Sequence, residues 1–431
     1  ERNYLGGSCV NYGCTPTKAL QAASQRIYMC KSAPALGTST FVAPVRWQEI
    51  SKHIQGIVRD FRSSTRESLV DHPNVDVHKG EAAFISNHNI KVSSEEGAGM
   101  LSGNTIIINT GATASIPPVE GLEDIPWLDK QAIFELKNLP ERLLIVGGGH
   151  IGVEFAQMFQ RLGSQVVLLE AGNQLLRGQE PEIVEGIQQI LEQEGIEIHT
   201  SAEITRFTTD QPYSISAELA SGDEVSGTHV LLAIGRVPVT EALNLASTDI
   251  ETDEKGYIHV NNAFETAVEG VFAIGDVIEG PMFTHRAYHD HYLLGRYLLE
   301  GKEIDRTGYE VPFTLFVDPQ FSSIGATRED LESTGQEYLV AILPANHIGR
   351  AVETGNATGN LMVYVDPHTD LILGAHFWCY QAGELISIIQ VAIENDVPYT
   401  NLQHMMFAHP TMAEGLNSLF SNIEAYIHQP A

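Results

Sequence analysis

The run Gly147-Gly148-Gly149-His150-Ile151-Gly152 constrains the fold more than any other part of the chain. An apolar strand is predicted before it at 143–146, and an amphipathic helix at 153–162 and a second strand at 166–169 are predicted after it. In such a unit the first glycine makes a tight turn, the second lets the backbone approach a pyrophosphate, and the third lets helix and strand pack. The pyrophosphate then lies at the helix N-terminus. The pattern therefore predicts a Rossmann-like domain whose dinucleotide contacts are Gly147, Gly149 and Gly152.

Glu170 follows the second strand of this unit, at the spacing expected for the acid that binds a ribose. Its carboxylate can accept both ribose hydroxyls and would repel a 2′-phosphate. The next residues, Ala171-Gly172-Asn173, contain no arginine that could bind such a phosphate. We therefore expect NADH to be favoured over NADPH. A glycine-rich turn that binds no ligand is the disfavoured alternative, because a predicted strand and helix flank the turn and an acid follows at the expected spacing.

Three further apolar runs end in a small residue and glycine: 106–111, 230–235 and 271–276. Each is predicted to be a strand, and ligands of open α/β sheets bind at the carboxyl ends of strands. Several cofactor-facing edges are therefore expected, and the residues concerned are Thr110, Gly111 and Gly235. Asp276 could bind the sugar chain of a second cofactor, although an acid at a strand end is more often a simple turn cap.

Cys9 and Cys14 are separated by four residues and stand before a Thr15-Pro16-Thr17-Lys18 segment that can open a helix. A helix N-terminus lowers the pKa of a cysteine, and the thiolate is the species that attacks disulfides. The spacing differs from the two-residue gap of a zinc knuckle, and Cys30 and Cys379 are isolated in the sequence. The pair therefore predicts a redox disulfide, with a structural disulfide or two unpaired thiols as the alternatives.

Near the C-terminus, His409 and Glu414 share one short segment. A histidine oriented by a carboxylate is a competent general acid and base near neutral pH. The histidines at 285, 289 and 291, with Asp290, invite a metal interpretation, but they lie on an expected amphipathic helix and we predict no metal site there.

The composition excludes several classes of partner. The 431 residues include 55 acids against 25 bases, a formal charge of -30 that disfavours nucleic acid and anionic membrane as partners. No apolar run approaches the ~20 residues of a membrane helix, and no signal peptide opens the chain. Four cysteines in this length are typical of a reducing compartment, so a cytoplasmic location is expected.

Taken in order, these motifs resemble the class I pyridine nucleotide-disulfide oxidoreductases, which include lipoamide dehydrogenase, glutathione reductase and mercuric reductase. The resemblance covers essentially the whole chain. Within the family, Gly349-Arg350-Ala351 and the segment 409–420 are most similar to the reactive-chlorine-resistance flavoproteins, which reduce copper or hypothiocyanous acid and are often labelled mercuric reductase-like.

The resemblance implies an α/β fold of two Rossmann-like dinucleotide-binding domains, the first incomplete, and a C-terminal α+β dimerisation domain. The expected order is an FAD-binding domain at 1–138, an NAD-binding domain at 139–260, the second part of the FAD-binding domain at 261–308 and an interface domain at 309–431. The polar segments 138–141 and 304–308 are the expected boundaries.

The resemblance also implies roles for single residues. FAD would be held by Asp276, by the Thr110-Gly111 turn and by Lys18, which would pair with Glu154 at the flavin N5 edge. Glu1 stands where the family has the acid for the FAD adenosine ribose. Hydride would pass from NADH to the flavin and then to the disulfide, with Cys14 as the charge-transfer thiolate and Cys9 as the interchange thiol. His409, oriented by Glu414, would come from the second subunit of a homodimer.

Two departures from the family pattern shape the expected function. The chain starts after the family's first glycine-rich βαβ unit of ~30 residues, which predicts a fragment or a protein that binds FAD poorly. It ends at 427–431 without the C-terminal cysteine pair of mercuric reductases, so mercury reduction is not expected. The predicted function is therefore NADH-driven, FAD-dependent reduction of a small oxidant, disulfide or metal ion.

Two alternatives stay open. Lipoamide dehydrogenase is one, because the segment 280–287 and the His409-Pro410-Thr411 motif are similar to it as well. A truncated, flavin-free remnant that only binds NADH is the other.

Overall fold

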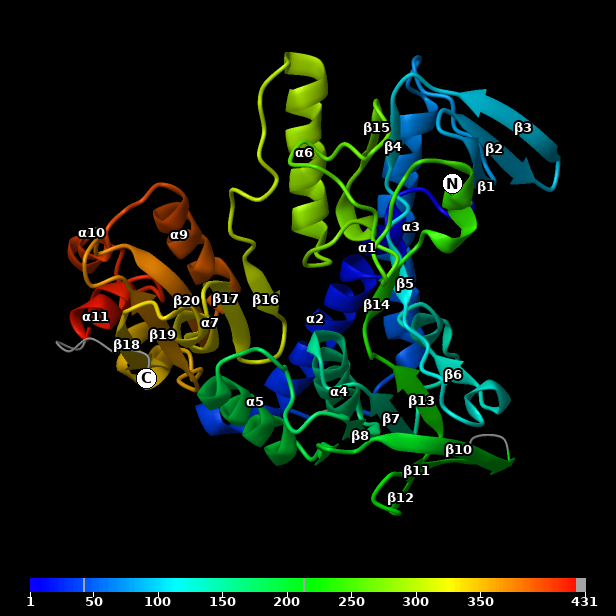
Figure 1. Ribbon diagram of the computed structural model, residues 1–431. Helices are drawn as coiled ribbons and strands as arrows, with labels where there is room; N and C mark the ends of the chain where they lie inside the picture. The colour runs from blue at the N-terminus through cyan, green and yellow to red at the C-terminus, as the bar shows by residue number, and fades with distance from the viewer. Residues whose placement is uncertain (42, 212–213, 424–431) are drawn as a thin grey trace.

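The structure is a computed structural model that describes residues 1–41, 43–211 and 214–423, so the chain end at 427–431 lies outside the described residues. Figure 1 shows three parts: a lower one built around a parallel sheet, an upper one that contains the N-terminus, and a separate C-terminal one. The α/β class expected from the sequence is confirmed.

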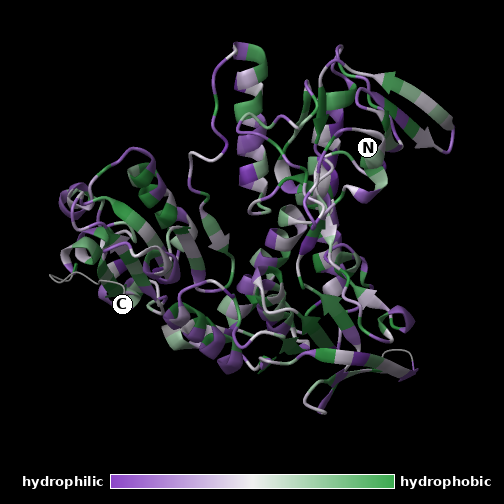
Figure 2. Ribbon diagram, viewed as in Figure 1, coloured by the Kyte–Doolittle hydropathy of each residue, from purple (hydrophilic) through white to green (hydrophobic). Residues whose placement is uncertain are grey.

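The parallel sheet forms the lower part. In spatial order its strands are β6 (Trp127–Leu128), β13 (His229–Leu232), β7 (Arg142–Val146), β8 (Gln165–Leu169) and β9 (Glu197–His199). One face packs against α4 (His150–Leu162) and α5 (Pro181–Gln193), and the other against an antiparallel sheet. Because both faces are covered, the central strands are apolar along their length, as their green colour in Figure 2 shows. The predicted strand, turn, helix, strand unit is confirmed.

The antiparallel sheet that covers the second face comes from one continuous stretch of chain. Its strands are β10 (Ile204–Gln211), β11 (Ser214–Leu219) and β12 (Glu224–Gly227). Phe207, Ile215 and Ala217 are buried against the parallel sheet.

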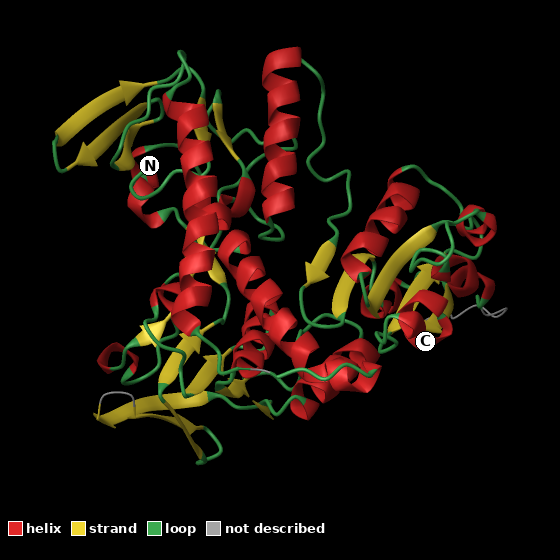
Figure 3. Ribbon diagram, turned by 180° about the vertical axis from the view of Figure 1, so that it is seen from behind, coloured by secondary structure: helices red, strands yellow, loops and turns green. Residues whose placement is uncertain are grey.

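The upper part joins segments that are far apart in the sequence. Strand β4 (Ile106–Ile108) pairs in parallel with β15 (Val271–Ala273), and β5 (Ala112–Ala114) pairs antiparallel with β14 (Arg236–Pro238). The helices of this part are α1 (Gly7–Asn11), α2 (Cys14–Ser32), α3 (Trp47–Val70) and α6 (Thr284–Glu300). A three-stranded sheet projects from its edge, as Figure 3 shows from behind: β1 (Glu81–Ser86), β2 (Asn89–Ser94) and β3 (Gly97–Ser102). Two of the three further strands predicted to end in glycine, β4 and β15, thus pair in this part, and the third is β13 of the parallel sheet.

The C-terminal part is an α+β domain with its own apolar core. Its antiparallel sheet has the spatial order β16 (Phe313–Leu315), β17 (Gln320–Gly325), β20 (Ile372–Cys379), β19 (Asn360–Val365) and β18 (Leu339–Pro344). Its helices are α7 (Arg328–Thr334), α8 (Gly349–Glu353), α9 (Ala382–Glu394), α10 (Tyr399–His404) and α11 (Gly415–Ser421).

Short 3-10 helices connect these elements: η1 (Ala33–Leu36), η2 (Leu122–Asp124), η3 (Ala132–Glu135), η4 (Glu241–Leu243), η5 (Leu245–Ser247), η6 (Gly275–Val277) and η7 (Ala345–His347). Within the described ranges, no helix combines the length and the apolar character that crossing a membrane requires.

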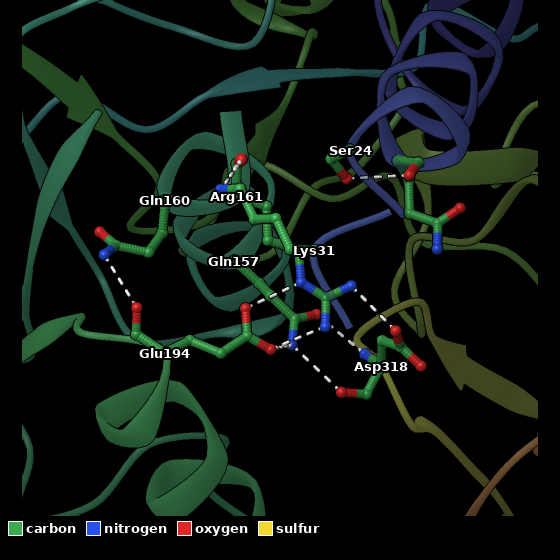
Figure 4. A network of polar contacts seen from close by, with 8 residues as sticks. Ser24, Lys31, Gln157, Gln160, Arg161, Glu194 and Asp318 are labelled. Carbon is green, nitrogen blue, oxygen red and sulfur yellow. Dashed lines mark hydrogen bonds and ion pairs between the residues drawn. The ribbon is translucent and has the colours of Figure 1, made fainter. Parts of the chain in front are cut away.

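A buried polar network, here called the α5-side cluster, ties the three parts together (Figure 4). Arg161 on α4 donates two hydrogen bonds to Glu194 at the end of α5, at 2.7 and 2.8 Å, and one to Asp318 between β16 and β17, at 2.9 Å. Gln157 bonds the same two partners, and Gln160 donates to the Glu194 carbonyl. The Arg161 carbonyl accepts a hydrogen bond from Lys31 on α2 at 3.1 Å. The Arg161 guanidinium also lies over the Tyr28 ring of α2, at 3.8 Å from the centroid, so one buried side chain contacts every part of the molecule.

Candidate active site

The two cysteines lie on successive helices. Cys9 is in α1, and Cys14 is the first residue of α2. The turn between them is held by two backbone hydrogen bonds to the Ser8 carbonyl, from Tyr12 at 2.9 Å and Gly13 at 2.6 Å. All four cysteines are free thiols, so the pair is present in its reduced form. The predicted position at a helix N-terminus is confirmed.

The two thiols have opposite acidities. A hydrogen bond from Cys9, a second from Thr284 and the charge of Lys18 lower the pKa of Cys14 to about 5, against the opposing effect of burial. The hydrogen bond to Cys14, together with burial, raises the pKa of Cys9. The Thr284 hydroxyl, at the first turn of α6, lies 3.2 Å from Cys14 Sγ. Cys14 is therefore the thiolate of the pair, and its negative charge faces two helix N-termini.

Lys18, Glu154 and Phe316 form what we call the cavity-side cluster. Lys18 Nζ lies 2.5 Å from Glu154 Oε2, and it also stands over the Phe316 ring at 4.2 Å from the centroid. The other oxygen of Glu154 accepts the Phe316 backbone N–H at 2.8 Å. The expected pairing of Lys18 with Glu154 is thus present, and it links α2, α4 and the segment after β16.

The glycine turn after β7 has the geometry that its pattern predicts. Gly147 has a φ of +109°, and a Cβ on Gly152 would lie 1.8 Å from the Gly147 carbonyl oxygen, so only glycine lets α4 pack this closely. A Cβ on Gly149 would meet no atom within 4 Å, so this residue faces open space. The Glu170 carboxylate accepts the N–H of Gly148 at 2.6 Å and of Gly172 at 2.7 Å, which fixes it beside the turn.

The strand ends of the upper part line the same cavity as this turn. Asp276 forms an ion pair with Arg236, at 2.6 Å between Nη1 and Oδ2, and Arg236 also donates to the Ala112 carbonyl at 3.0 Å. The Arg236 Nε is buried and has no hydrogen-bond partner among the described residues. Thr110 donates to the Val239 carbonyl at 2.7 Å, and Gly111 next to it faces open space.

One cavity of 2110 Å³ is lined both by the glycine turn after β7 and by the strand ends of the upper part. Most residues of the predicted site line it: Glu1, Cys9, Cys14, Lys18, Thr110, Gly111, Gly147, Gly149, Glu154, Glu170, Gly235 and Asp276. Gly152 lies behind the wall, in the contact between α4 and β7. The open glycines, the free Arg236 N–H and the carboxylates on both sides fit two dinucleotides that meet near the cysteines.

Four residues of this wall were given no role from the sequence: Lys130, His150, Arg236 and Thr284. His150 packs against Phe313, at 4.2 Å between ring centroids, and burial lowers the pKa of its imidazole to about 4, so it is neutral. Two of them carried a signal in the sequence. Arg236 directly follows a predicted strand end and Thr284 begins a helix, and both positions are typical of residues that bind a ligand. Lys130 carries no such signal.

His409 and Glu414 are not brought to the cysteines within one chain. His409 Nδ1 lies 2.8 Å from Glu414 Oε2, as the short spacing predicts. The His409 side chain is 78% exposed, and neither residue lines the cavity. The histidine is therefore oriented and available on the surface of the C-terminal domain.

The α6 histidines do not form a metal centre with Asp290. The buried Asp290 carboxylate accepts the Gly275 N–H and the Tyr309 hydroxyl, each at 3.0 Å. His285 stacks on Phe283 and lines the cavity, and burial lowers its pKa. Within the part of the chain that the structure describes, no three His, Cys, Asp or Glu side chains are grouped to bind a metal ion.

Comparison with known families gives two matches that together span most of the chain. Residues 2–290 match the family described as pyridine nucleotide-disulphide oxidoreductase, and residues 311–420 match its dimerisation domain.

Individual relatives cover nearly the whole chain as well. The probable pyridine nucleotide-disulfide oxidoreductase RclA of Escherichia coli (strain K12) is 34% identical over 425 residues, which are 97% of this chain and 91% of that protein. The mercuric reductase of Lysinibacillus sphaericus is 31% identical over 96% of this chain and 76% of its own length. The mitochondrial dihydrolipoyl dehydrogenase of Pisum sativum is 32% identical over 96% of this chain and 84% of its own.

Among solved structures, the Cu(II) complex of the HOCl-induced flavoprotein disulfide reductase RclA from Escherichia coli superposes with a TM-score of 0.89 at 31% identity. The match covers 98% of this chain and 93% of that one.

Proposed function

Because the chain belongs to the pyridine nucleotide-disulphide oxidoreductase family, we propose that it passes electrons from NADH through Cys9 and Cys14 to a small oxidant, disulfide or metal ion. The observation that carries the proposal is the Cys14 thiolate, which lies in one cavity with the glycine turn of the pyridine nucleotide site. FAD, the cofactor of this family, supplies the two-electron chemistry between the nicotinamide and the cysteine pair.

Each cofactor has residues that fit it. For FAD these are Glu1, Lys18, Thr110, Gly111, Glu154 and Asp276. For NADH they are Gly147, Gly149, Gly152, Glu170 and Gly235. Support for NADH over NADPH comes from Glu170, whose carboxylate is held at the cavity by two backbone N–H groups and would repel a 2′-phosphate.

The different acidities of the two cysteines give them different roles. Cys14 remains a thiolate at neutral pH, so it holds negative charge at the inner wall of the cavity. Cys9, the protonated partner, attacks the oxidant once a base has removed its proton, and the resulting mixed bond is then displaced by Cys14 to regenerate the disulfide. This half-reaction gives two electrons to the acceptor and forms one Cys9–Cys14 bond, and two electrons from NADH break that bond again to complete the cycle.

His409 of the partner subunit is the proposed base. In a single chain His409 is exposed and lies outside the cavity, while its own carboxylate partner orients it at 2.8 Å. A homodimer, assembled through the matched dimerisation domain, would bring it to Cys9 of the other copy. We place this chemistry in the cytoplasm, because a chain of this length with only four cysteines is typical of a reducing compartment.

Steady-state assays with NADH test the proposal directly. We expect rapid reduction of hypothiocyanite or Cu(II), the latter because RclA has been crystallised as a Cu(II) complex, and slow turnover of lipoamide. Slow reduction of every small oxidant would contradict it.

The second candidate is dihydrolipoyl dehydrogenase activity, favoured by the 32% identity to the Pisum sativum enzyme over nearly the whole chain. Rapid NAD-linked oxidation of dihydrolipoamide would establish this activity in place of the first. A purified protein without a flavin absorbance band after reconstitution would instead support a flavin-free NADH-binding protein.

A further inference from the structure

Lys130 is a cation on the cavity wall that the proposed chemistry does not use. It lies between β6 and η3, in a turn fixed by Asp129, whose Oδ1 accepts the N–H groups of Gln131 at 2.9 Å and Ala132 at 2.8 Å. The Lys130 side chain is partly buried and lines the cavity. The turn therefore holds the lysine at this wall.

The ammonium group of Lys130 has no neutralising contact of its own. Within the described residues it makes no hydrogen bond and no ion pair. The nearest carboxylates are already used, because Asp129 binds backbone N–H groups and Asp276 is paired with Arg236 at 2.6 Å. This corner of the cavity thus carries two cations, Lys130 and Arg236, and the Asp276 carboxylate is already paired with Arg236.

Burial first, and the charge of Arg236 second, lower the pKa of Lys130 to about 8, while Asp276, Asp129 and Cys14 act in the opposite direction. The amine is therefore still mostly protonated at neutral pH. Leaving such a charge partly desolvated and unpaired is unfavourable, unless a ligand with complementary negative charge completes the site.

The neighbours of Lys130 indicate which ligand this is. The lysine interacts electrostatically with both Asp276 and Cys14. Asp276 is the residue expected at the sugar chain of FAD, and Cys14 is the thiolate expected against its ring. A lysine that lies near both residues and lines the cavity is placed at its flavin end.

We propose that Lys130 contacts the flavin ring of FAD and favours its reduced state, which carries more negative charge than the oxidised one. This inference rests on the proposed function, because it requires bound FAD. The physical reason is that a nearby cation in a cavity of low polarity stabilises added electron density. Removing the charge should therefore weaken binding of reduced FAD more than binding of oxidised FAD.

The test uses Lys130→Met, which keeps the length of the side chain, and Lys130→Arg, which keeps the charge. The exposed Lys137→Met in the same segment is the matched control. All are made in a Cys9→Ser, Cys14→Ser background, so that FAD is the only redox couple of the site. After reconstitution with FAD, its midpoint potential is measured against a reference dye, and its dissociation constant is measured in the oxidised form.

We expect Lys130→Met to lower the ratio of affinities for reduced over oxidised FAD about tenfold, which is about 30 mV of lower midpoint potential for two electrons. Lys130→Arg and Lys137→Met should keep the potential of the parent protein. Equal potentials in all variants would overturn the inference while leaving the proposed function intact. A change in NADH affinity with an unchanged potential would also overturn it, since the lysine would then serve the nucleotide.

A parent protein that does not take up FAD at all would overturn both the inference and the proposed function. Should Lys130→Met unfold, which thermal unfolding of each variant reveals, the comparison of Lys130→Gln with Lys130→Arg decides in its place. The expected order of potentials is the same.

Discussion

Helix α4 carries two clusters of oppositely charged side chains. Both link α4 to α2 and to the strand region after β16, but they differ in how far their charges are exposed to the cavity. The cavity-side cluster links α2 to α4 through Lys18 and Glu154, and α4 to the strand region after β16 through Phe316. The α5-side cluster repeats this arrangement two turns further along α4, where Arg161 contacts α2 and, at Asp318, the same strand region.

Burial and pairing separate the two clusters. The Arg161 side chain is 4% exposed and uses its donors on two carboxylates, so the cluster is closed on itself. Lys18 is 33% exposed, lines the cavity and has one carboxylate partner. Its charge also lowers the pKa of Cys14. We therefore expect the enclosed cluster to serve stability, and the cluster whose cation stays in contact with the cavity to serve chemistry.

The largest expected effect on activity comes from Cys14→Ser, which tests whether the cavity-side cluster serves chemistry. Removing the thiolate that the cavity-side cluster stabilises should abolish turnover with every acceptor, because no disulfide can form. Cys9→Ser should abolish it as well, but the two variants should differ in the long-wavelength charge-transfer absorbance of the reduced enzyme. We expect the band to be lost in Cys14→Ser and retained in Cys9→Ser. The reverse result would exchange the roles of the two cysteines.

The next effect concerns a proton partner that neither cluster supplies. His409→Ala should slow thiol chemistry by roughly 10²- to 10⁴-fold, the usual contribution of a general acid or base. The exposed His368→Ala is the control and should leave the rate unchanged. Mixing His409→Ala chains with Cys14→Ser chains should restore activity, since a mixed dimer contains one intact site. No recovery after subunit exchange would argue against a site shared between two copies.

The local parts of this molecule were predictable, and the clusters mostly were not. The glycine turn, α4 and the strands around it follow from the hydrophobic period and from glycines within one short segment. Cys14 and Thr284, by contrast, are 270 residues apart in the sequence and 3.2 Å apart in space. The Arg161 contacts to Glu194 and Asp318 span 33 and 157 residues. Hydrophobic periodicity reports only on neighbouring residues, so it could not predict these contacts.

The residues that were predicted across long separations came from the family resemblance. Lys18 and Glu154 are unremarkable singly, and their ion pair, 136 residues apart, was expected only because the family pairs these positions. The family resemblance did not predict the role of Arg236. It follows Gly235 directly, yet its ion pair with Asp276 appears only once β14 and β15 are placed at the same cavity.

Arg161→Met should show the stabilising role of the α5-side cluster. Removing the guanidinium leaves Glu194 and Asp318 without their cation, and breaking one side of a buried ion pair costs about 3–5 kcal/mol. We expect a lower midpoint of urea unfolding and an unchanged kcat for the protein that remains folded. Arg206→Met removes an exposed arginine with partners at 3.9 and 4.0 Å and should change the midpoint little. Equal midpoints for the two variants would mean that the buried cluster does not hold the parts together.

Lys18→Met should cost less stability than Arg161→Met and have a specific effect on acidity. The lysine is 33% exposed but Glu154 is only 10% exposed, so the loss should exceed the ~1 kcal/mol of a surface pair, while only one carboxylate instead of two loses its cation. Its charge, however, favours the Cys14 thiolate, so the pKa of Cys14 should rise when the charge is removed. The alkylation rate of Cys14 by iodoacetamide, measured in Cys9→Ser with and without Lys18→Met, follows the thiolate as pH increases. Because Cys9→Ser itself changes the main hydrogen bond to Cys14, only the shift between the two variants is diagnostic. A shift toward higher pH places Lys18 in the chemistry of the cavity, whereas coincident profiles with a large loss of stability would make the two clusters equivalent.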